Sequence, residues 1–464
     1  MNLDLYLWAG LLIWLGVIAL FLYMLFRKEG RSVGLSTIYL VRLWLIHWVA
    51  AALYILPWFS ATDKEMIFSG FVQSVYAVLS FAVGVLILGP WMLRLFLPQA
   101  GASDNMSMAN KSIDQRLPKI YMATGLLSML VLLPLLRGVP TVLALLAAAI
   151  QFLVVGLALA CWQAWQRKAY GAFARWLMLV LCFPIFTIVL QGYLGYGVYA
   201  LLAIIIFVAT FVRIRMRVIL ISLVIGYLGL SLYVTYMRDR QNIRETVWSD
   251  TSIGRSFQEV QSTMRNFEWF NPLNTIHLQL INMRLNQNIL VGATVFYLGS
   301  GYQEFAHGAT FHDAAIALIP RILWPEKPVV AGSPGLVTAY TGIPVAEEST
   351  SVGIGQVMEF YINFGTFGVI TGFLILGSII AVFDKLATRA LDRGNQQQFT
   401  LWFLPGLGFT QVGGSLVEIT STVAASFITV IIVNRIYNFF LQVGLRKADH
   451  ARSHLPPKAQ IHRR

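Results

Sequence analysis

Charged residues are scarce in this chain. Asp, Glu, Lys and Arg together make up 12% of the 464 residues, whereas hydrophobic residues make up 57%. Soluble domains have about 25% charged residues, so the composition excludes an ordinary soluble globular protein. The class that fits is a polytopic membrane protein, in which most helices are apolar along their whole length.

Cysteine and the common catalytic motifs are also nearly missing. The two cysteines, Cys161 and Cys182, both lie in apolar runs, which excludes a disulfide framework and a Cys-based metal site and predicts two buried side chains. No GxxxxGK[ST], GxSxG or GxGxxG pattern is present, so nucleotide-driven chemistry is not expected. The net charge of +13 is spread over short connections without a basic, aromatic groove, which argues against nucleic acid as a partner.

The apolar runs predict an all-α polytopic membrane protein with about 11 transmembrane helices. Each run comes close to the ~20 residues that cross a bilayer. The tenth run contains Pro405 and several glycines, so a kinked or re-entrant segment is expected there. The predicted spans are 4–26, 38–60, 66–89, 119–137, 140–163, 175–191, 195–212, 217–236, 366–384, 399–412 and 416–441.

Basic residues in the short loops predict the orientation. Clusters at Arg27, Arg167, Arg213 and Arg446 fall on one side if the N-terminus is outside and the C-terminus is cytoplasmic, as the positive-inside rule requires. The predicted regions are an N-terminal bundle at 1–236, one large extracytoplasmic loop region at 237–365, C-terminal helices at 366–445 and a basic tail at 446–464. The tail is expected to attract anionic membrane lipids.

The polar segment from about residue 238 to 364 is the expected place for chemistry, because it holds 11 of the 21 acids. Short or amphipathic helices are expected within it. The spacing of apolar residues from Ser256 predicts a helix that lies on the membrane or caps the bundle and ends at Asn271–Pro272. Farther on, Gln356, Glu359 and Asn363 are three or four residues apart, which predicts one polar stripe on a helix entering the bundle.

The string PRILWPEKP is the most distinctive in this segment. Arg321 offers a fork that can hold phosphate oxygens, Lys327 adds a positive charge, and Trp324 can stack on a sugar face. A simpler interpretation is an interfacial loop, in which Trp324 anchors at the headgroups and Glu326 pairs with Lys327.

Several acids could accept a proton from a sugar hydroxyl, as glycosyl transfer requires. Glu359 and Glu348 are the leading candidates. The run from Glu347 to Ser351 could equally be an ordinary helix start, with acids that favour the helix dipole.

Other polar residues of the segment are candidates for substrate contact. The spacing of Glu304, His307 and His312 does not match a helical zinc pair, so no metal is predicted and hydrogen bonding to substrate is preferred. The remaining candidates are Tyr340 and the arginines, of which Arg255 and Arg265 are favoured over Arg238, Arg240, Arg244 and Arg284. Arg42, His47 and Glu418 lie within predicted spans and would matter for function if they face a cavity. Arg42 and Glu418 also lie near span ends, where snorkelling to the membrane surface is the simpler interpretation.

The strings IPRILWPEKP and TSVGIGQVMEFYINFGTFGVITGFLILG resemble those of Wzy-type polymerases of O-antigen and exopolysaccharide repeat units. The resemblance is detailed over about residues 300–380. It implies a GT-C-like glycosyltransferase in the bacterial inner (cytoplasmic) membrane, which moves a growing glycan from an undecaprenyl-pyrophosphate donor to a lipid-linked acceptor. Arg321 and Lys327 would then hold the pyrophosphate, and no cofactor is expected.

The same resemblance implies that donor and acceptor are both undecaprenyl-pyrophosphate-linked oligosaccharides. A chain-length regulator and a flippase are the candidate protein partners. Three alternatives stay open at this point: an O-antigen ligase-like transferase with another acceptor, a transporter or flippase of lipid-linked glycans, and a structural membrane subunit.

Overall fold

The computed structural model describes residues 3–27, 32–59, 64–96, 114–136, 140–212, 216–249, 253–319, 324, 326–328, 332–345 and 352–453. Within these ranges every regular element is a helix and no strand occurs, which confirms the predicted all-α class.

Eight helical stretches in the described ranges are long and apolar enough to cross a membrane, which supports a multi-pass membrane protein. Some of them are built from consecutive helices. The helices concerned are α1 (Leu3–Arg27), α2 (Leu35–Leu53), α3 (Lys64–Val83) with η1 (Gly84–Leu88) and α4 (Gly89–Phe96), α5 (Leu117–Leu127) with η3 (Ser128–Leu132) and α6 (Leu133–Leu135), α7 (Pro140–Ile150) with α8 (Phe152–Gln166), α9 (Tyr170–Leu181) with α10 (Phe183–Gln191), α18 (Gln356–Asp392) and α20 (Leu416–Ser453).

The other three predicted spans have a different form. Helices α11 (Leu194–Ala209) and α19 (Gln396–Phe409) have 16 and 14 residues, fewer than the ~20 that cross a bilayer. Helix α12 (Met216–Trp248) has 33 residues and runs from the predicted eighth span into the polar segment without a break. Cys161 is buried as predicted, but Cys182 is exposed, because it lies where α9 and α10 meet on the outside of the bundle.

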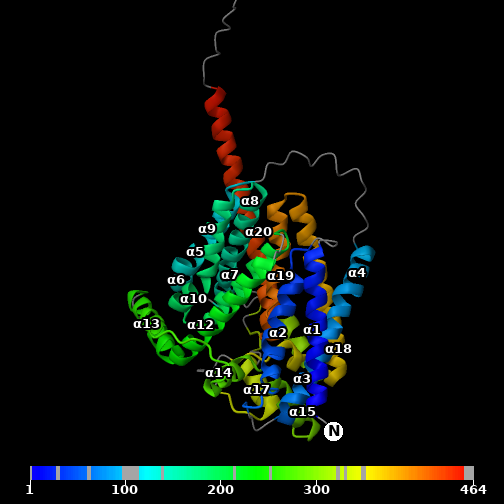
Figure 1. The fold of residues 1–464 in the computed structure, drawn as a ribbon. Coiled ribbons are helices and arrows are strands. Elements are labelled where there is room, and N and C mark those ends of the chain that lie inside the picture. Colours follow the sequence, from blue (N-terminus) through cyan, green and yellow to red (C-terminus); the bar gives the residue numbers. More distant parts are fainter. Residues whose placement is uncertain are drawn as a thin grey trace, which may run out of the picture.

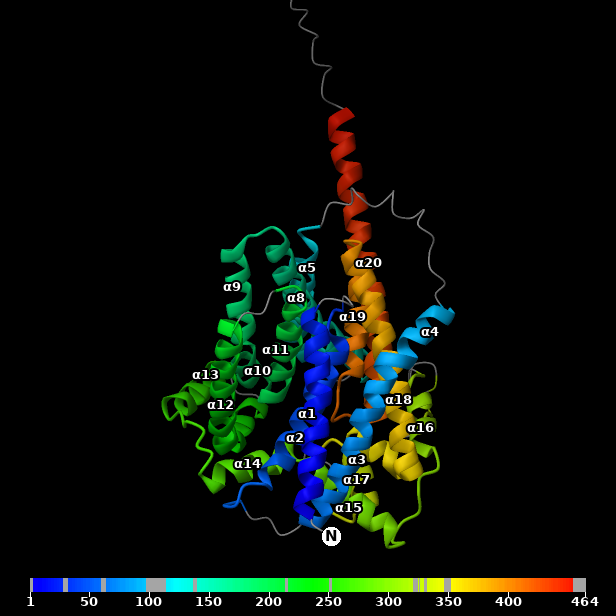
Figure 2. The ribbon, with the colours of Figure 1, turned by 45° about the vertical axis from the view of Figure 1, so that its right-hand side comes forward.

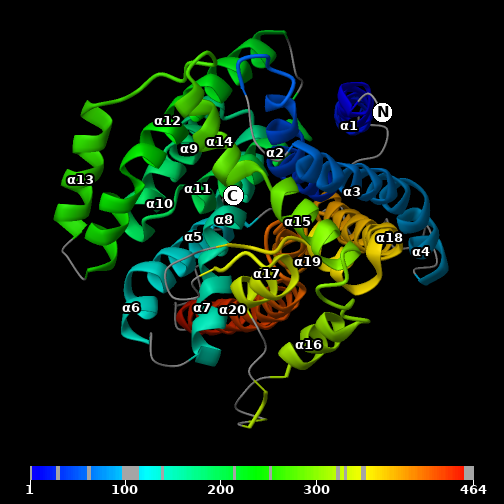
Figure 3. The same cartoon turned by 90° about the horizontal axis from the view of Figure 1, so that it is seen from below.

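The polar segment gathers at one end of the molecule (Figures 1 and 2). Its helices α13 (Ile253–Arg265), α14 (Thr275–Leu285), α15 (Asn288–Gly299), α16 (Ala309–Ala317) and α17 (Ser333–Thr341) lie toward the end where α1 begins, and α20 projects from the opposite end. The view along the bundle shows α13 at one edge, beside α10 and α12, and α16 at another edge (Figure 3).

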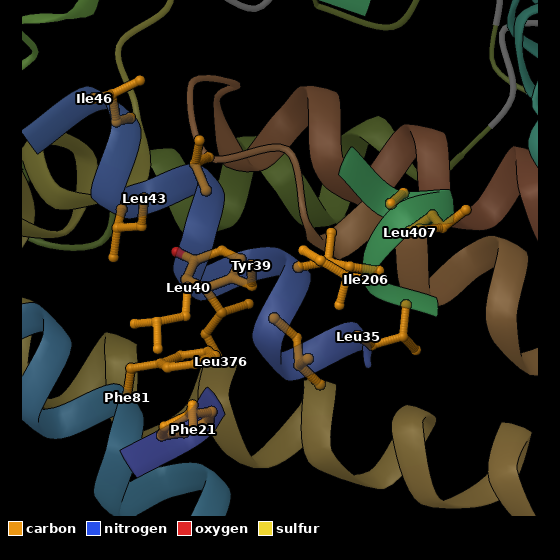
Figure 4. Close-up of a cluster of buried hydrophobic side chains, with 14 of the residues drawn as sticks. Phe21, Leu35, Tyr39, Leu40, Leu43, Ile46, Phe81, Ile206, Leu376 and Leu407 are labelled. Carbon is orange, nitrogen blue, oxygen red and sulfur yellow. The ribbon is translucent and has the colours of Figure 1, made fainter. Parts of the chain in front are cut away.

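Helix α2 forms the centre of the hydrophobic core. It packs against its sequence neighbours α1 and α3 and against the distant helices α11, α18 and α19, so that all six share one buried cluster (Figure 4). Burial of each large side chain contributes roughly 1.5–3 kcal/mol relative to exposure to water. Representative members are Phe21, Leu35, Tyr39, Leu40, Leu43, Ile46, Phe81, Ile206, Leu376 and Leu407.

A buried carboxylate fixes the start of α2. Asp384, on α18, accepts hydrogen bonds from the Ser32 hydroxyl (2.8 and 2.9 Å), the Val33 amide (2.8 Å) and the Ser36 amide (3.3 Å). These donors include amides that the first turn of a helix leaves unpaired. Asp384 therefore joins α18 to α2 and is itself stabilised by the hydrogen bonds that it accepts.

Helix α18 changes direction sharply. Phe364 and Gly365 are non-helical, and Gly365 has φ +60° and ψ −148°, a conformation that is essentially restricted to glycine. A Cβ on Gly372 would lie 2.5 Å from the Phe360 ring, so the stretch before the kink folds back against the stretch after it. The kink falls at the predicted boundary between the loop region and the C-terminal helices.

Helices α3 and α15 cross with their backbones in contact. A Cβ on Gly292 would collide with the Met66 carbonyl oxygen, and a Cβ on Gly70 would collide with the Asn288 carbonyl oxygen. Small residues permit this kind of close helix packing in membranes. The crossing positions the chain on both sides of α15, including Gln287 and the loop that carries His307.

We predict that Gly292→Ala destabilises the protein by about 1–3 kcal/mol or more, because the added methyl group must push two backbones apart. Gly299→Ala on the same helix is the matched control, since a Cβ there meets no atom within 4 Å. Thermal unfolding of both variants in the same detergent provides the comparison. Equal unfolding temperatures for the two variants would contradict the close crossing.

Candidate functional site

Two non-helical segments meet inside the bundle. Residues 352–355 lead into α18, and residues 410–415 join α19 to α20. The Gly355 amide donates a hydrogen bond to the Gly413 carbonyl oxygen at 3.1 Å, and a Cβ on Gly353 would collide with the same oxygen. Glycine at position 353 therefore allows the two backbones to approach each other.

Side-chain amides hold these segments in place. The Gln356 amide nitrogen donates to the carbonyl oxygens of Gln411 (2.5 Å) and Gly414 (3.2 Å), and the Gln356 amide oxygen accepts from the Tyr39 hydroxyl at 3.1 Å. The Gln287 amide donates to the Gly353 carbonyl oxygen at 2.7 Å. Helical hydrogen bonding does not pair these backbone oxygens, so buried side chains supply the donors.

Arg42 also binds the second segment. It is only 6% exposed, and it donates to the Thr410 carbonyl oxygen (3.0 Å), the Thr410 hydroxyl (2.5 Å) and the Tyr199 carbonyl oxygen (2.7 Å). Its Nε has no hydrogen-bond partner. The expectation that Arg42 snorkels to the membrane surface is therefore wrong. Sequence position alone could not reveal the nearby carbonyl oxygens.

Glu359 lies at the centre of the site, with 0% exposure. One carboxylate oxygen accepts a hydrogen bond of 2.6 Å from the Leu416 amide, at the start of α20. The other oxygen makes no hydrogen bond of ordinary geometry. The Thr310 hydroxyl is the neighbouring uncharged side chain that interacts with this carboxyl group. Two further carboxylates, Glu418 and Asp313, also act on it electrostatically.

The predicted polar stripe is confirmed. Gln356, Glu359 and Asn363 are all buried on the first part of α18. The Asn363 amide nitrogen donates to the Thr310 hydroxyl at 2.8 Å, and its amide oxygen accepts from the Gly308 amide at 2.9 Å. The stripe thus connects α18 to the start of α16.

Glu418 connects the site to the surface. Its carboxylate accepts from the Ser333 hydroxyl at 3.1 Å and from the Ser415 amide at 3.2 Å, and the residue is exposed. The sequence left open whether Glu418 faces a cavity or snorkels from a span end. Its relation to Glu359 follows from the fold, because both carboxylates bind backbone amides at the start of α20.

The PRILWPEKP string is described only in part, and Arg321 and Glu348 lie outside the described residues. The Lys327 ammonium group donates to the carbonyl oxygens of Ala317 (3.1 Å) and Ile319 (3.0 Å), at the end of α16. Cations commonly bind the carbonyl oxygens that the last turn of a helix leaves unpaired. Lys327 therefore ties the loop to the end of α16, and its predicted contact with substrate stays a prediction.

The structure distributes the other predicted residues over the surface of this end. Trp324 is 37% exposed, Tyr340 is half-buried, and Glu304, His307 and His312 are exposed. In the part of the chain that the structure describes, no group of three or more His, Cys, Asp or Glu side chains could hold a metal ion. The His307 loop nevertheless adjoins the stripe, because the next residue, Gly308, binds Asn363.

Arg255 and Arg265 do not reach the Glu359 site. Both are exposed on α13, which buries Ser256, Val260 and Thr263 and packs against α10 and α12. The predicted amphipathic helix therefore lies against the side of the bundle, with its buried face toward α10 and α12. It ends at Arg265, six residues before Asn271.

The profile of a domain of unknown function, DUF8712, matches residues 102–441, so the chain belongs to this family. The match includes Glu359, Glu418 and both non-helical segments, whereas Arg42 lies before it. Searches of curated proteins and of solved structures found no match.

An ion network at the surface joins α12 to α14. The Glu268 carboxylate accepts from the His277 ring at 2.7 Å and from Arg238 at 3.3 Å, and Arg238 also pairs with Asp239 at 2.9 Å. The His277 hydrogen bond, together with Arg238, lowers the pKa of the Glu268 carboxyl group. The network therefore depends on ionised Glu268.

The sign of the pH dependence follows from this lowered pKa. The contribution of Glu268 to stability is fully present above its unfolded pKa of about 4.3, and it is lost as the pH falls through the lower folded pKa. We predict that Glu268→Gln weakens the loss of stability below about pH 5, while Glu65→Gln, at an exposed acid on α3, preserves it. Unfolding temperatures measured across pH compare the variants, and identical acid profiles would contradict this role of Glu268.

Proposed function

We propose that this member of the DUF8712 family is an integral-membrane glycosyltransferase of the GT-C-like class. It polymerises glycan by moving a growing chain from an undecaprenyl-pyrophosphate-linked donor to a lipid-linked repeat unit. The reaction takes place at the extracytoplasmic face of a bacterial inner membrane, with the N-terminus outside and the C-terminus in the cytoplasm. The chain crosses the membrane up to eleven times in this proposal. The eight candidate spans are among these crossings, and the helices surround the site.

The observation that carries the proposal is the geometry of Glu359. A carboxylate with 0% exposure keeps one oxygen on the Leu416 amide, and the other oxygen has no hydrogen bond of ordinary geometry, with the Thr310 hydroxyl as its neighbour. A carboxylate so placed can accept the proton of a hydroxyl group brought next to it. Fixed orientation inside the protein adds to the rate, because the base does not have to be reoriented during the reaction.

The reaction that fits is attack by an acceptor sugar hydroxyl on the anomeric carbon of the donor. A new C–O bond forms, the bond from that carbon to the pyrophosphate oxygen breaks, and the pyrophosphate takes the electron pair. The hydroxyl proton passes to Glu359. The polyprenyl pyrophosphate supplies the energy, which agrees with a sequence that contains no nucleotide-binding motif.

The distribution of polar residues supports the proposed side of the membrane. The polar segment lies toward the end where α1 begins, opposite the projecting end of α20 (Figures 1 and 2). Basic short loops favour the cytoplasm for the opposite end. Lipid-linked pyrophosphate at the outer headgroup level would then lie on the same side as the polar segment.

A transporter or flippase of lipid-linked glycans is the second candidate. It is favoured by the two non-helical segments that meet within the bundle, because many transporters build their substrate sites from broken helices. A ligase-like transferase would share the donor and differ in its acceptor. Reconstitution in liposomes with a defined lipid-linked oligosaccharide separates the three functions by product length, by acceptor and by movement of the lipid.

We predict that Glu359→Gln lowers polymer formation by about 10²–10⁴-fold, the usual contribution of a general base. The purified protein is mixed with a defined lipid-linked repeat unit, and the product length is read on a gel. Glu65→Gln is the control, because this acid is exposed at the start of α3. Full polymer length from a folded Glu359→Gln variant would rule out Glu359 as the base.

A further inference from the structure

Three arginines of the polar segment come together although they carry like charges. Arg240 and Arg244 are one turn apart on α12, and Arg284 lies on α14. Burial lowers the pKa of the Arg240 guanidinium group, and the positive charges of Arg284 and Arg244 lower it further. Like charges four residues apart destabilise a helix by a few tenths of a kcal/mol, so the group has an electrostatic cost that an anion would offset.

The protein itself supplies little negative charge to these arginines. In the ranges that the structure describes, none of the three forms an ion pair. Asp239 pairs with Arg238, and Glu245, which is exposed on the same helix, accepts from the Gln241 amide at 3.0 Å. Arg240 forms a side-chain hydrogen bond with the Tyr236 hydroxyl.

Aromatic rings orient the Arg244 guanidinium group. Its central carbon lies 4.5 Å from the centre of the Tyr193 ring and 5.2 Å from that of Trp248. Stacking on a ring fixes the plane of a guanidinium group and leaves its edge available for phosphate oxygens. The Arg244 Nε is buried and has no hydrogen-bond partner, so part of its donor capacity is unused.

Tyrosines of α11 and α12 lie within electrostatic range of the arginine group. Arg240 and Arg284 interact electrostatically with Tyr233 on α12, and so does Tyr199 on α11. The Tyr199 ring centre lies 4.9 Å from the central carbon of the Arg42 guanidinium group. On the same helix, Tyr196 interacts with both Arg244 and Glu418. Tyr196 is therefore within electrostatic range of one arginine of the group and of Glu418, the carboxylate that also acts on Glu359.

We infer that Arg240, Arg244 and Arg284 form a binding site for a phosphate or diphosphate ester. The inference rests on the proposed function, in which the same anion is the donor's diphosphate. As the bond between the anomeric carbon and the diphosphate breaks, the leaving oxygen gains negative charge, which the guanidinium groups stabilise. The acceptor hydroxyl then loses its proton to Glu359 on the neighbouring side.

Direct binding of inorganic pyrophosphate tests the site without any glycan. The full chain is placed in nanodiscs of zwitterionic phosphatidylcholine, and the affinity is measured by calorimetry. We predict that Arg240→Gln and Arg244→Gln each weaken binding at least about tenfold, because a charge-assisted hydrogen bond contributes roughly 1.5–3 kcal/mol. Added salt also weakens binding. Arg175→Gln, at an exposed arginine of α9, leaves the affinity unchanged.

The unfolding temperature of each variant shows whether it is folded. Arg244→Lys keeps the charge but loses the planar fork, so an intermediate affinity is expected. Absence of pyrophosphate binding by the wild type, or equal affinity in the wild type and both folded glutamine variants, would overturn the site.

Two competition measurements with lipids show whether the site binds the diphosphate of a polyprenyl donor or the headgroups of anionic membrane lipids. A short polyprenyl diphosphate should displace pyrophosphate, whereas nanodiscs enriched in phosphatidylglycerol should not. The reverse result would assign the site to anionic headgroups and overturn its role with the donor. Polymer formation by a protein that does not bind pyrophosphate would refute this inference alone. Pyrophosphate binding without glycan transfer would refute the proposed function and leave the anion site in place.

Discussion

The pairing of polar backbone groups within an apolar bundle is the constraint on which this structure depends. A bilayer supplies no water, so each non-helical residue inside the bundle needs a protein partner. The segments at 352–355 and 410–415 meet this requirement together: Gly355 binds Gly413, and Gln356 binds Gln411 and Gly414. Neither segment could keep its path without the other, and the position of Glu359 follows from their contact.

The same requirement explains why charged residues are buried here. The Arg42 guanidinium group donates to Thr410, the Glu359 carboxylate accepts from Leu416, and Asp384 accepts from the start of α2. Each charge replaces water at backbone groups that a helix end or a broken segment leaves unpaired. Asp384 is fully used in this way. Arg42 Nε and one oxygen of Glu359 have no hydrogen bond of ordinary geometry, so both groups keep hydrogen-bonding capacity that a bound molecule could use.

In the proposed reaction, proton transfer and anion binding are carried out by different groups of residues. Carboxylates lie where α16, α18 and α20 meet, and arginines lie on α12 and α14. Tyr196 of α11 is within electrostatic range of Arg244 and of Glu418. A transfer reaction on a lipid-linked glycan needs both groups within one molecule's reach, one to take a proton and one to hold a leaving anion. The two groups belong to helices far apart in sequence, so the distance between them is a property of the tertiary structure.

The sequence by itself determined the helical class, most of the membrane spans and the polar stripe of Gln356, Glu359 and Asn363, because these follow from local apolarity and from the period of a helix. It also located the polar segment. Only the tertiary structure decided which polar residues meet. The sequence left Arg42 between a snorkelling residue and one that faces a cavity, and the fold showed that it is buried against Thr410 and Tyr199. The sequence also could not show that Lys327 contacts the end of α16. The physical reason is that the partner of a buried polar group comes from another helix, and neither composition nor spacing records that contact.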